Sequence, residues 1–330
     1  MFQRKHAMLF ILLVKLAEGN KPLVSVSDLL SFVFKKKEVV SNSNQLLQQK
    51  QDLLLIGAGY GRTGTASYVE ALKRLGLKSY HMKDGVMATQ GHLDLWAQYA
   101  ETQKQLSLGR DSNYTHPQLA NIIDQISYAG FNATADVPAG LFFWEMMERY
   151  PNAKVVLTVR GKGGAEAWAN SMLKTNAGFV ATICTRLPFR WLSPTTKFCT
   201  FSKMMRRLQQ VELDETTQLP FRESLLKSYD EWNAHVISKV PPEKLLVFAA
   251  SDGWEPLCNF VSPVHPTIEA KCREILYSGE SYPFTNDSAS LQRTYAVASA
   301  MAAIFEISPV LILLFILLLI SMRWGKRKID

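Results

Sequence analysis

The chain of 330 residues is 47% hydrophobic and 20% charged, so it can fold around a sizeable core and is not an intrinsically disordered chain. Lysine and arginine outnumber aspartate and glutamate by 37 to 29, and the resulting net charge of +8 suits phosphate- or sulfate-bearing ligands or an anionic membrane face. No basic run is interleaved with aromatic residues, which argues against nucleic-acid binding.

The N-terminal residues 1–20 have the outline of a secretory signal, because a basic start precedes the apolar stretch Ala7–Val14. Lys15 cuts that stretch short, and an amphipathic N-terminus is the alternative. Residues 21–50 are rich in Lys, Ser, Asn and Gln and are interpreted as a linker. The folded domain is expected to follow over residues 51–295.

Apolar, strand-like segments alternate with segments of helical periodicity from Asp52 onward. Strands are predicted at residues 53–57, 77–82, 131–137, 153–160 and 244–250. Helices are predicted at residues 65–76, 116–129, 139–150, 165–175, 223–240 and 253–261. This alternation predicts an α/β fold, a three-layer sandwich with a central parallel sheet whose functional edge lies at the carboxyl ends of its strands.

The four cysteines show no CxxC spacing, which argues against a metal site or a redox motif. They are Cys184, Cys199, Cys258 and Cys272. Disulfide bonds between them would require a lumenal domain. We therefore expect a protein without a metal.

The C-terminal run Ile307–Met322 carries no charge and is followed by a basic tail over residues 323–330. Sixteen helical residues span about 24 Å, short of a hydrocarbon core of about 30 Å. Extension back to residue 298 closes this gap, so a single transmembrane helix is predicted over residues 298–322. The basic tail would then be cytosolic, and with a genuine signal the domain would be lumenal, in a Golgi or other secretory-pathway membrane.

The segment LLLIGAGYGRTGT, residues 53–65, places a glycine-rich loop between the first predicted strand and the first helix. Such a loop directs backbone N–H groups and the positive end of a helix dipole at one point, which forms an anion-binding cradle. The glycines let the backbone approach the ligand closely.

Three common phosphate-binding loops fit this segment poorly. Residues 59–64 satisfy GxGxxG, but the acidic residue of a dinucleotide fold is missing at the end of the second strand, residues 80–82. An NTPase loop requires wider glycine spacing and a lysine where Arg62 stands. A cysteine-dependent phosphatase requires its nucleophile at Ile56.

Four longer stretches together resemble the sulfotransferase-like P-loop family. They are GYGRTGTASYVEALKRLGLKSYHM, DVP, YPNAKVVLTVR and VPPEKLLVFAASDGWEPLCNF. The similarity extends from Asp52 to Phe260, with a fainter match at Pro283–Asn286. It implies transfer of a sulfuryl group from PAPS, 3′-phosphoadenosine 5′-phosphosulfate, to a hydroxyl or amine, with a nucleotide donor and an acceptor as partners. The membrane is a further expected partner, through the predicted C-terminal helix.

The resemblance also assigns the two ends of the donor. The 5′ phosphosulfate would contact Gly61, Arg62, Thr63, Gly64, Thr65 and Ala66. The permanently charged Arg62 would stabilise the leaving phosphate. The 3′ phosphate would contact Arg160 and Ser171, although their spacing is longer than in the family and the surplus lies in residues 161–164.

Three residues are candidates for the general base. Asp136, in DVP, occupies the position of a family His-Leu-Pro histidine, and its alternative role is a helix N-cap. His81 is a second candidate or a loop histidine, and Glu145 is a third. Tyr229 and His235 are assigned to packing.

Two other functions remain open from the sequence. The missing family histidine and the long spacing from Arg160 to Ser171 also fit a membrane-anchored nucleotide-binding protein without turnover. A P-loop nucleotide kinase or NTPase is the further alternative.

Overall fold

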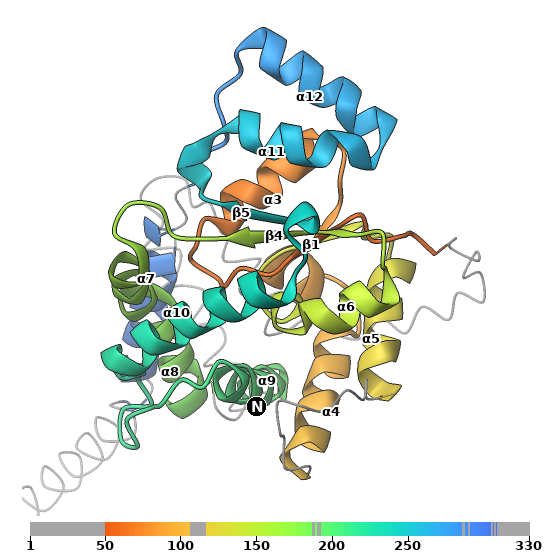
Figure 1. Ribbon diagram of the computed structural model, residues 1–330. Helices are drawn as coiled ribbons and strands as arrows, with labels where there is room; N and C mark the ends of the chain where they lie inside the picture. Colours follow the sequence, from red (N-terminus) through yellow and green to blue (C-terminus); the bar gives the residue numbers. More distant parts are fainter. Residues whose placement is uncertain are drawn as a thin grey trace, which may run out of the picture.

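The computed structural model describes residues 50–105, 117–186, 189, 193–285, 288–289, 291–304, 306 and 308. In it, one sheet of five parallel strands has the order β2-β3-β1-β4-β5 (Figure 1). The strands are β1 (Leu55–Gly57), β2 (Ser79–Tyr80), β3 (Ala133–Thr134), β4 (Lys154–Thr158) and β5 (Leu245–Phe248). Each lies within a strand predicted from the sequence, and the α/β class with a central parallel sheet is confirmed.

Helices cover both faces of the sheet (Figure 1). One face is covered by α3 (Thr65–Arg74), α11 (Trp254–Val261) and α12 (Pro266–Ser278). Below the other face lie α4 (His92–Gln105), α5 (Pro117–Tyr128), α6 (Phe143–Arg149), α9 (Ser193–Leu208) and α10 (Arg222–Lys239). Two further helices, α7 (Gly164–Met172) and α8 (Gly178–Thr185), lie beside these layers and are joined by a π-helical turn, Leu173–Ala177.

The central strands are buried on both sides, which explains their continuous hydrophobic character. Leu55 and Val156 pack into the core beneath α3 and α11. Ile56, Val155 and Leu157 point to the opposite face and pack with the helices there. Because side chains alternate along a strand, both layers obtain an apolar surface from the same short segments.

Because all five strands are parallel, the loops that follow them lie at one edge of the sheet. β1 lies between β3 and β4, with Leu55 opposite Ala133 on one side and Gly57 opposite Val156 on the other. The chain turns away in different directions after β1 and β3, which creates a switch point at the carboxyl ends of the strands. The glycine-rich loop leaves β1 at this point.

The helical segments differ from the sequence prediction in two ways. The expected helix over residues 139–150 is divided into a 3-10 turn, Ala139–Phe142, and α6. Four helices were not predicted at all, namely α4, α8, α9 and α12.

All four cysteines are paired. Cys184 and Cys199 connect α8 to α9, and Cys258 and Cys272 connect α11 to α12. The Cα atoms of the pairs lie 5.6 Å and 5.4 Å apart, within the usual range for disulfides. Each bridge therefore ties together two helices that are neighbours in the chain.

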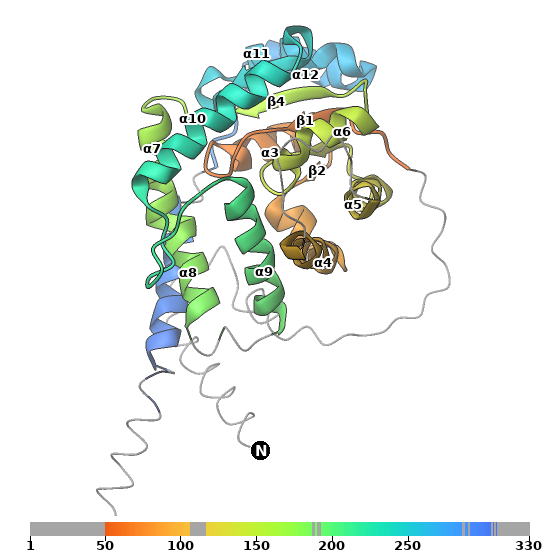
Figure 2. The same cartoon turned by 60° about the horizontal axis from the view of Figure 1, so that its bottom comes forward.

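The C-terminal helical residues 291–304 lie alongside α8 (Figure 2). Ala298 and Ala302 share a small apolar cluster with Ile183 of α8, and Glu306 forms an ion pair with Arg186. The described ranges contain no helix that is both long and apolar enough to cross a membrane. The predicted transmembrane segment 298–322 lies mostly outside those ranges, as do the signal, nearly all of the linker and the basic tail.

Candidate functional site

The glycine-rich loop after β1 is fixed by hydrogen bonds to its carbonyl groups. The Trp232 indole N–H donates to the Ala58 carbonyl at 2.7 Å, and that of Trp168 donates to the Gly61 carbonyl at 2.8 Å. The hydroxyl of Thr63 donates to the Tyr60 carbonyl at 2.6 Å. With two carbonyls held by tryptophans outside the loop and a third held by a hydroxyl within it, the path of the loop is set before any ligand binds.

Two positions in the loop have no room for a side chain. A Cβ atom at Gly59 would lie 2.0 Å from the Thr158 hydroxyl, and one at Gly61 would lie 2.7 Å from Oδ1 of Asp136. Gly61 thus allows the carboxylate of Asp136 to pack directly against the loop. The glycine pattern noted in the sequence is therefore a requirement of close packing.

Arg62 projects from a left-handed backbone position, with a φ of 71°. Its Nε atom donates to the Ser171 hydroxyl at 3.3 Å, and its Nη2 atom donates to the Ser288 hydroxyl at 2.5 Å. The Nη1 atom of Arg160 donates to the Arg62 carbonyl at 3.2 Å. The two arginines assigned from the sequence therefore lie next to each other, and Ser171 lies with them.

The segment between Arg160 and Ser171 turns back through its glycines. Gly163 and Gly164 have φ values of 92° and 46°, and the Gly164 N–H donates to the Gly161 carbonyl at 3.0 Å. This turn accommodates the additional residues, so that α7 begins close enough to place Ser171 beside the loop.

The first turn of α3 offers unsatisfied donors to a ligand. Gly64 occupies the N-cap and has no side chain to cap the helix, which leaves the first N–H groups, among them those of Thr65 and Ala66, available. The Thr65 hydroxyl has no hydrogen-bond partner among the described residues, whereas the Thr63 hydroxyl is buried between the Tyr60 carbonyl and Thr158. Of the two threonines, only Thr65 therefore has a hydroxyl that is not already used within the protein.

Asp136 and His81 form a pair on the other side of the loop. His81 follows β2 and Asp136 follows β3, and these strands pair with Tyr80 opposite Thr134. The His81 Nε2 atom lies 3.3 Å from Oδ2 of Asp136, and Oδ1 accepts a hydrogen bond from the Val137 N–H at 2.6 Å. These two candidate bases are therefore partners in one site.

The remaining candidate base lies elsewhere. Glu145 is on α6, where burial raises the pKa of its carboxyl group, and its charge acts on the nearby Tyr99. Neither Asp136 nor His81 is among the groups that shift the pKa of Glu145.

An apolar cavity of about 110 Å³ opens beside Gly61 and Asp136. Its apolar walls include Val137, Trp168, Met172, Val180, Phe198, Phe201 and Met205. A polar edge next to an apolar pocket is the usual arrangement of a small-molecule site. The cavity thus provides space for a small ligand next to the carboxyl group of Asp136.

Comparison with known proteins shows which family this chain resembles. A family model described as a sulfotransferase domain matches residues 54–291. The chain belongs to the sulfotransferase family. Ava biosynthesis cluster protein M from Aspergillus versicolor is 31% identical to this sulfotransferase-family chain over 209 residues, which cover 62% of the chain and 74% of that protein.

Several residues that shape the sulfotransferase-family site were not assigned to it from the sequence. Trp168 and Trp232 hold the loop, and the hydroxyl oxygen of Tyr229 accepts a hydrogen bond from the backbone N–H of Arg160 at 2.7 Å. Ser288 reaches Arg62 from a segment 226 residues away. The spacing of Tyr229 and Trp232, which places them on one face of α10, is one sequence signal for these contacts.

Proposed function

We propose that the protein transfers a sulfuryl group from PAPS to a hydroxyl or amine of an acceptor bound in the apolar cavity. The observation that carries this proposal is the convergence of Arg62, Arg160 and Ser171 at the start of α3. The Arg160 guanidinium lies 3.2 Å from the Arg62 carbonyl, and the Arg62 guanidinium lies 3.3 Å from the Ser171 hydroxyl. A single nucleotide with phosphates on both sides of its ribose can contact both cations.

The donor side of the site would act on the leaving group. The N–H groups at the start of α3 and the Thr65 hydroxyl would hold the 5′ phosphate, and Arg160 with Ser171 would hold the 3′ phosphate. Negative charge builds on the oxygen that bridges sulfur and phosphorus as that bond breaks. Arg62 would stabilise this charge without giving up a proton, because its guanidinium stays protonated.

The acceptor side would supply the base. The acceptor oxygen or nitrogen attacks sulfur, a new bond to sulfur forms, and the bond from sulfur to the bridging oxygen breaks. The proton of the acceptor passes to the pair formed by Asp136 and His81, whose carboxylate and imidazole lie 3.3 Å apart. The products are the sulfated acceptor and adenosine 3′,5′-bisphosphate.

Ligand titration of the purified protein tests the donor assignment. We expect adenosine 3′,5′-bisphosphate to bind more tightly than ATP or NAD, because only the bisphosphate can contact both arginines. A preference for ATP would instead indicate a kinase or ATPase. Tight binding of the bisphosphate together with no release of label from radiolabelled PAPS, over a broad set of acceptors, would indicate a binding protein without turnover.

We also propose that the protein is attached to a membrane through its predicted C-terminal helix, residues 298–322, which contains the uncharged run 307–322, with its domain in an oxidising compartment. The charge-free sequence supports the first part, and the pairing of all four cysteines supports the second. Alkaline carbonate extraction of cell membranes, combined with protease protection of the domain, tests both. Release by carbonate would refute the anchor, and digestion in intact vesicles would refute the lumenal orientation.

A further inference from the structure

Arg206, on α9, lies between two adjoining cavities. The cavity beside Asp136 and a second one of about 220 Å³ share Val180, Ser202 and Arg206 in their walls. The proposed reaction edge and Arg206 thus border the same first cavity. This cationic side chain has no part in the donor site described above.

One face of α9 forms a wall of the first cavity. Phe198, Phe201, Ser202, Met205 and Arg206 all line it, and their spacing is that of neighbouring positions on a helix surface. Apart from Arg206, the large side chains on this face are apolar. They can bury the hydrocarbon or aromatic body of a ligand, while Arg206 remains the one cation of this wall.

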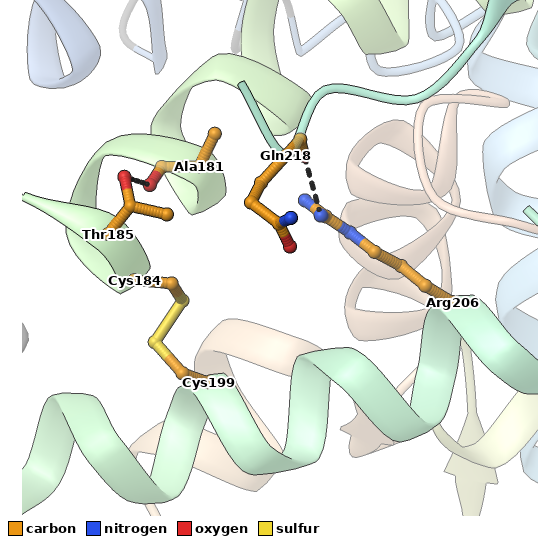
Figure 3. The surroundings of a disulfide bond; sticks show 6 residues. All are labelled: Ala181, Cys184, Thr185, Cys199, Arg206 and Gln218. Carbon is orange, nitrogen blue, oxygen red and sulfur yellow. Dashed lines mark hydrogen bonds between the residues drawn. A yellow bond between two sulfur atoms is a disulfide. The ribbon is translucent and has the colours of Figure 1, made fainter. Parts of the chain in front are cut away.

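The guanidinium of Arg206 is poorly neutralised. Its Nη1 atom donates to the Gln218 carbonyl at 3.1 Å, as Figure 3 shows, and no ion pair joins it to a carboxylate within the described part of the chain. An arginine carries five N–H donors, so most of its hydrogen-bonding capacity is left over. Burial lowers the pKa of Arg206, which is the expected effect of placing a charge in apolar surroundings without a counterion.

The surroundings of Arg206 are held in place by a disulfide. Cys184 of α8 and Cys199 of α9 both line the second cavity, and their bond crosses between the two helices (Figure 3). Cys199 lies about two turns before Arg206 on the same helix. The wall that presents the guanidinium is therefore fixed relative to α8, which makes the charge part of a preformed site.

We propose that Arg206 binds a carboxylate of the acceptor. The acceptor is then a largely apolar molecule that carries a carboxylate together with a hydroxyl or an amine. Its hydroxyl or amine faces Asp136, and its carboxylate receives the N–H donors of Arg206 that the protein leaves unused. A singly charged carboxylate matches a single half-buried guanidinium in both charge and planar geometry. This inference rests on the proposed sulfotransferase function and names the acceptor class for that site.

Paired probes test the proposal without any turnover. A series of 4-hydroxyphenylalkanoic acids of increasing chain length and the matching neutral amides are titrated into the protein by calorimetry, without a donor present. We expect at least one acid to bind about tenfold more tightly than its amide, because a charge-assisted hydrogen bond is lost in the amide. Arg206→Gln should remove this preference while amide binding stays unchanged, and Arg206→Lys should keep part of it.

Arg207→Gln provides the matched control, because it removes the same charge from the next residue of α9, which is exposed and lines neither cavity. Its preference for the acid should equal that of the unaltered protein. Equal binding of acid and amide, no binding of either, or an acid preference that survives Arg206→Gln would overturn the proposal. If Arg206→Gln does not fold, the acid and amide comparison on the unaltered protein decides. Failure of the sulfotransferase function would appear separately, as weak binding of adenosine 3′,5′-bisphosphate.

Discussion

The Nε2 atom of His81 lies 3.3 Å from the Asp136 carboxylate, and this pair borders the loop at Gly61. The contact follows from the sheet, because β2 and β3 are neighbours with Tyr80 opposite Thr134. Each residue comes just after its strand, so both side chains emerge at the same edge. Two residues that the sequence offers as rival bases therefore lie in contact at one edge of the sheet, as the proposed proton transfer requires.

Asp136→Asn should lower the rate of sulfuryl transfer by about 10²- to 10⁴-fold, because the general base is lost. The asparagine can still accept the hydrogen bond from the Val137 N–H, so affinity for adenosine 3′,5′-bisphosphate should not change. His81→Asn should also reduce the rate, and the double variant should be little worse than Asp136→Asn, as expected for residues that act together. Steady-state rates with PAPS test this, and fully multiplicative losses would show that the two act separately.

Arg160→Gln should weaken binding of adenosine 3′,5′-bisphosphate by about tenfold or more while affinity for AMP stays nearly constant. The reason is that AMP lacks the 3′ phosphate proposed to contact this guanidinium. Calorimetric titration of both nucleotides measures the difference, with Arg207→Gln as a charge-matched control, because Arg207 is exposed and lines neither cavity. An equal loss for both nucleotides would place Arg160 at the 5′ end of the donor.

The parts of the fold that depend on local pattern could be predicted from the sequence. All five strands lie within the strand segments predicted from the sequence, and the glycine-rich loop follows the first of them. The loop glycines were expected to bring the backbone close to a ligand, and the structure gives two of them a further reason, because Gly59 packs against Thr158 and Gly61 against Asp136. Helix α9 was missed because its first half, SPTTKFCT, combines a proline with serine, threonine and cysteine, which are weak helix formers. Its apolar contacts across the chain stabilise it, and the bond from Cys199 to α8 connects it further.

The residues that meet in the site are far apart in the sequence. Arg62 and Ser171 are separated by 109 residues, and the Ala58 carbonyl and Trp232 by 174 residues. No spacing rule connects such positions. For the same reason, the pairing of the cysteines could not be chosen from the three possible connectivities. The resemblance to the family identified Arg160 and Ser171, while the residues that support the loop required the three-dimensional structure.

Trp168→Phe should reduce stability by about 1 kcal/mol and weaken donor binding, because the Gly61 carbonyl loses its indole partner. Trp254→Phe is a suitable control. Trp254 is also buried, but its indole N–H has no hydrogen-bond partner among the described residues, so its loss should cost less. Urea unfolding and titration with adenosine 3′,5′-bisphosphate provide the two measurements. Equal effects of both substitutions on donor binding would argue against the role of Trp168 in holding the loop.

Non-reducing peptide mapping should recover two linked pairs, Cys184 with Cys199 and Cys258 with Cys272, and an alkylating reagent should label no cysteine before reduction. Replacing both members of either pair by serine should lower stability by about 3 kcal/mol, as expected for closed loops of this length. The sequence separations are 15 and 14 residues, so the two losses should be similar. Rapid alkylation of the native, unreduced protein would contradict the pairing.

His92 should make the protein less stable in mild acid. It is buried, its Nδ1 atom lies 3.1 Å from the Tyr80 hydroxyl, and burial lowers the pKa of His92 from its ordinary 6.5 to about 4. The folded protein therefore keeps His92 neutral where the unfolded chain takes up a proton. Its contribution to the free energy of unfolding is present above pH 6.5, falls as the pH drops towards about 4, and changes no further below that value.

Urea unfolding at several pH values across this window measures the effect. We expect His92→Gln to lose less stability than the unaltered protein between pH 7 and pH 4, by about 1 to 2 kcal/mol after allowance for partial screening by solvent. His265→Asn is the control, because His265 is exposed and asparagine can still cap α12. Suppose that the free energy of unfolding of His92→Gln changed with pH in parallel with that of the unaltered protein. His92 would then take up its proton in the folded protein over the same pH range as in the unfolded chain.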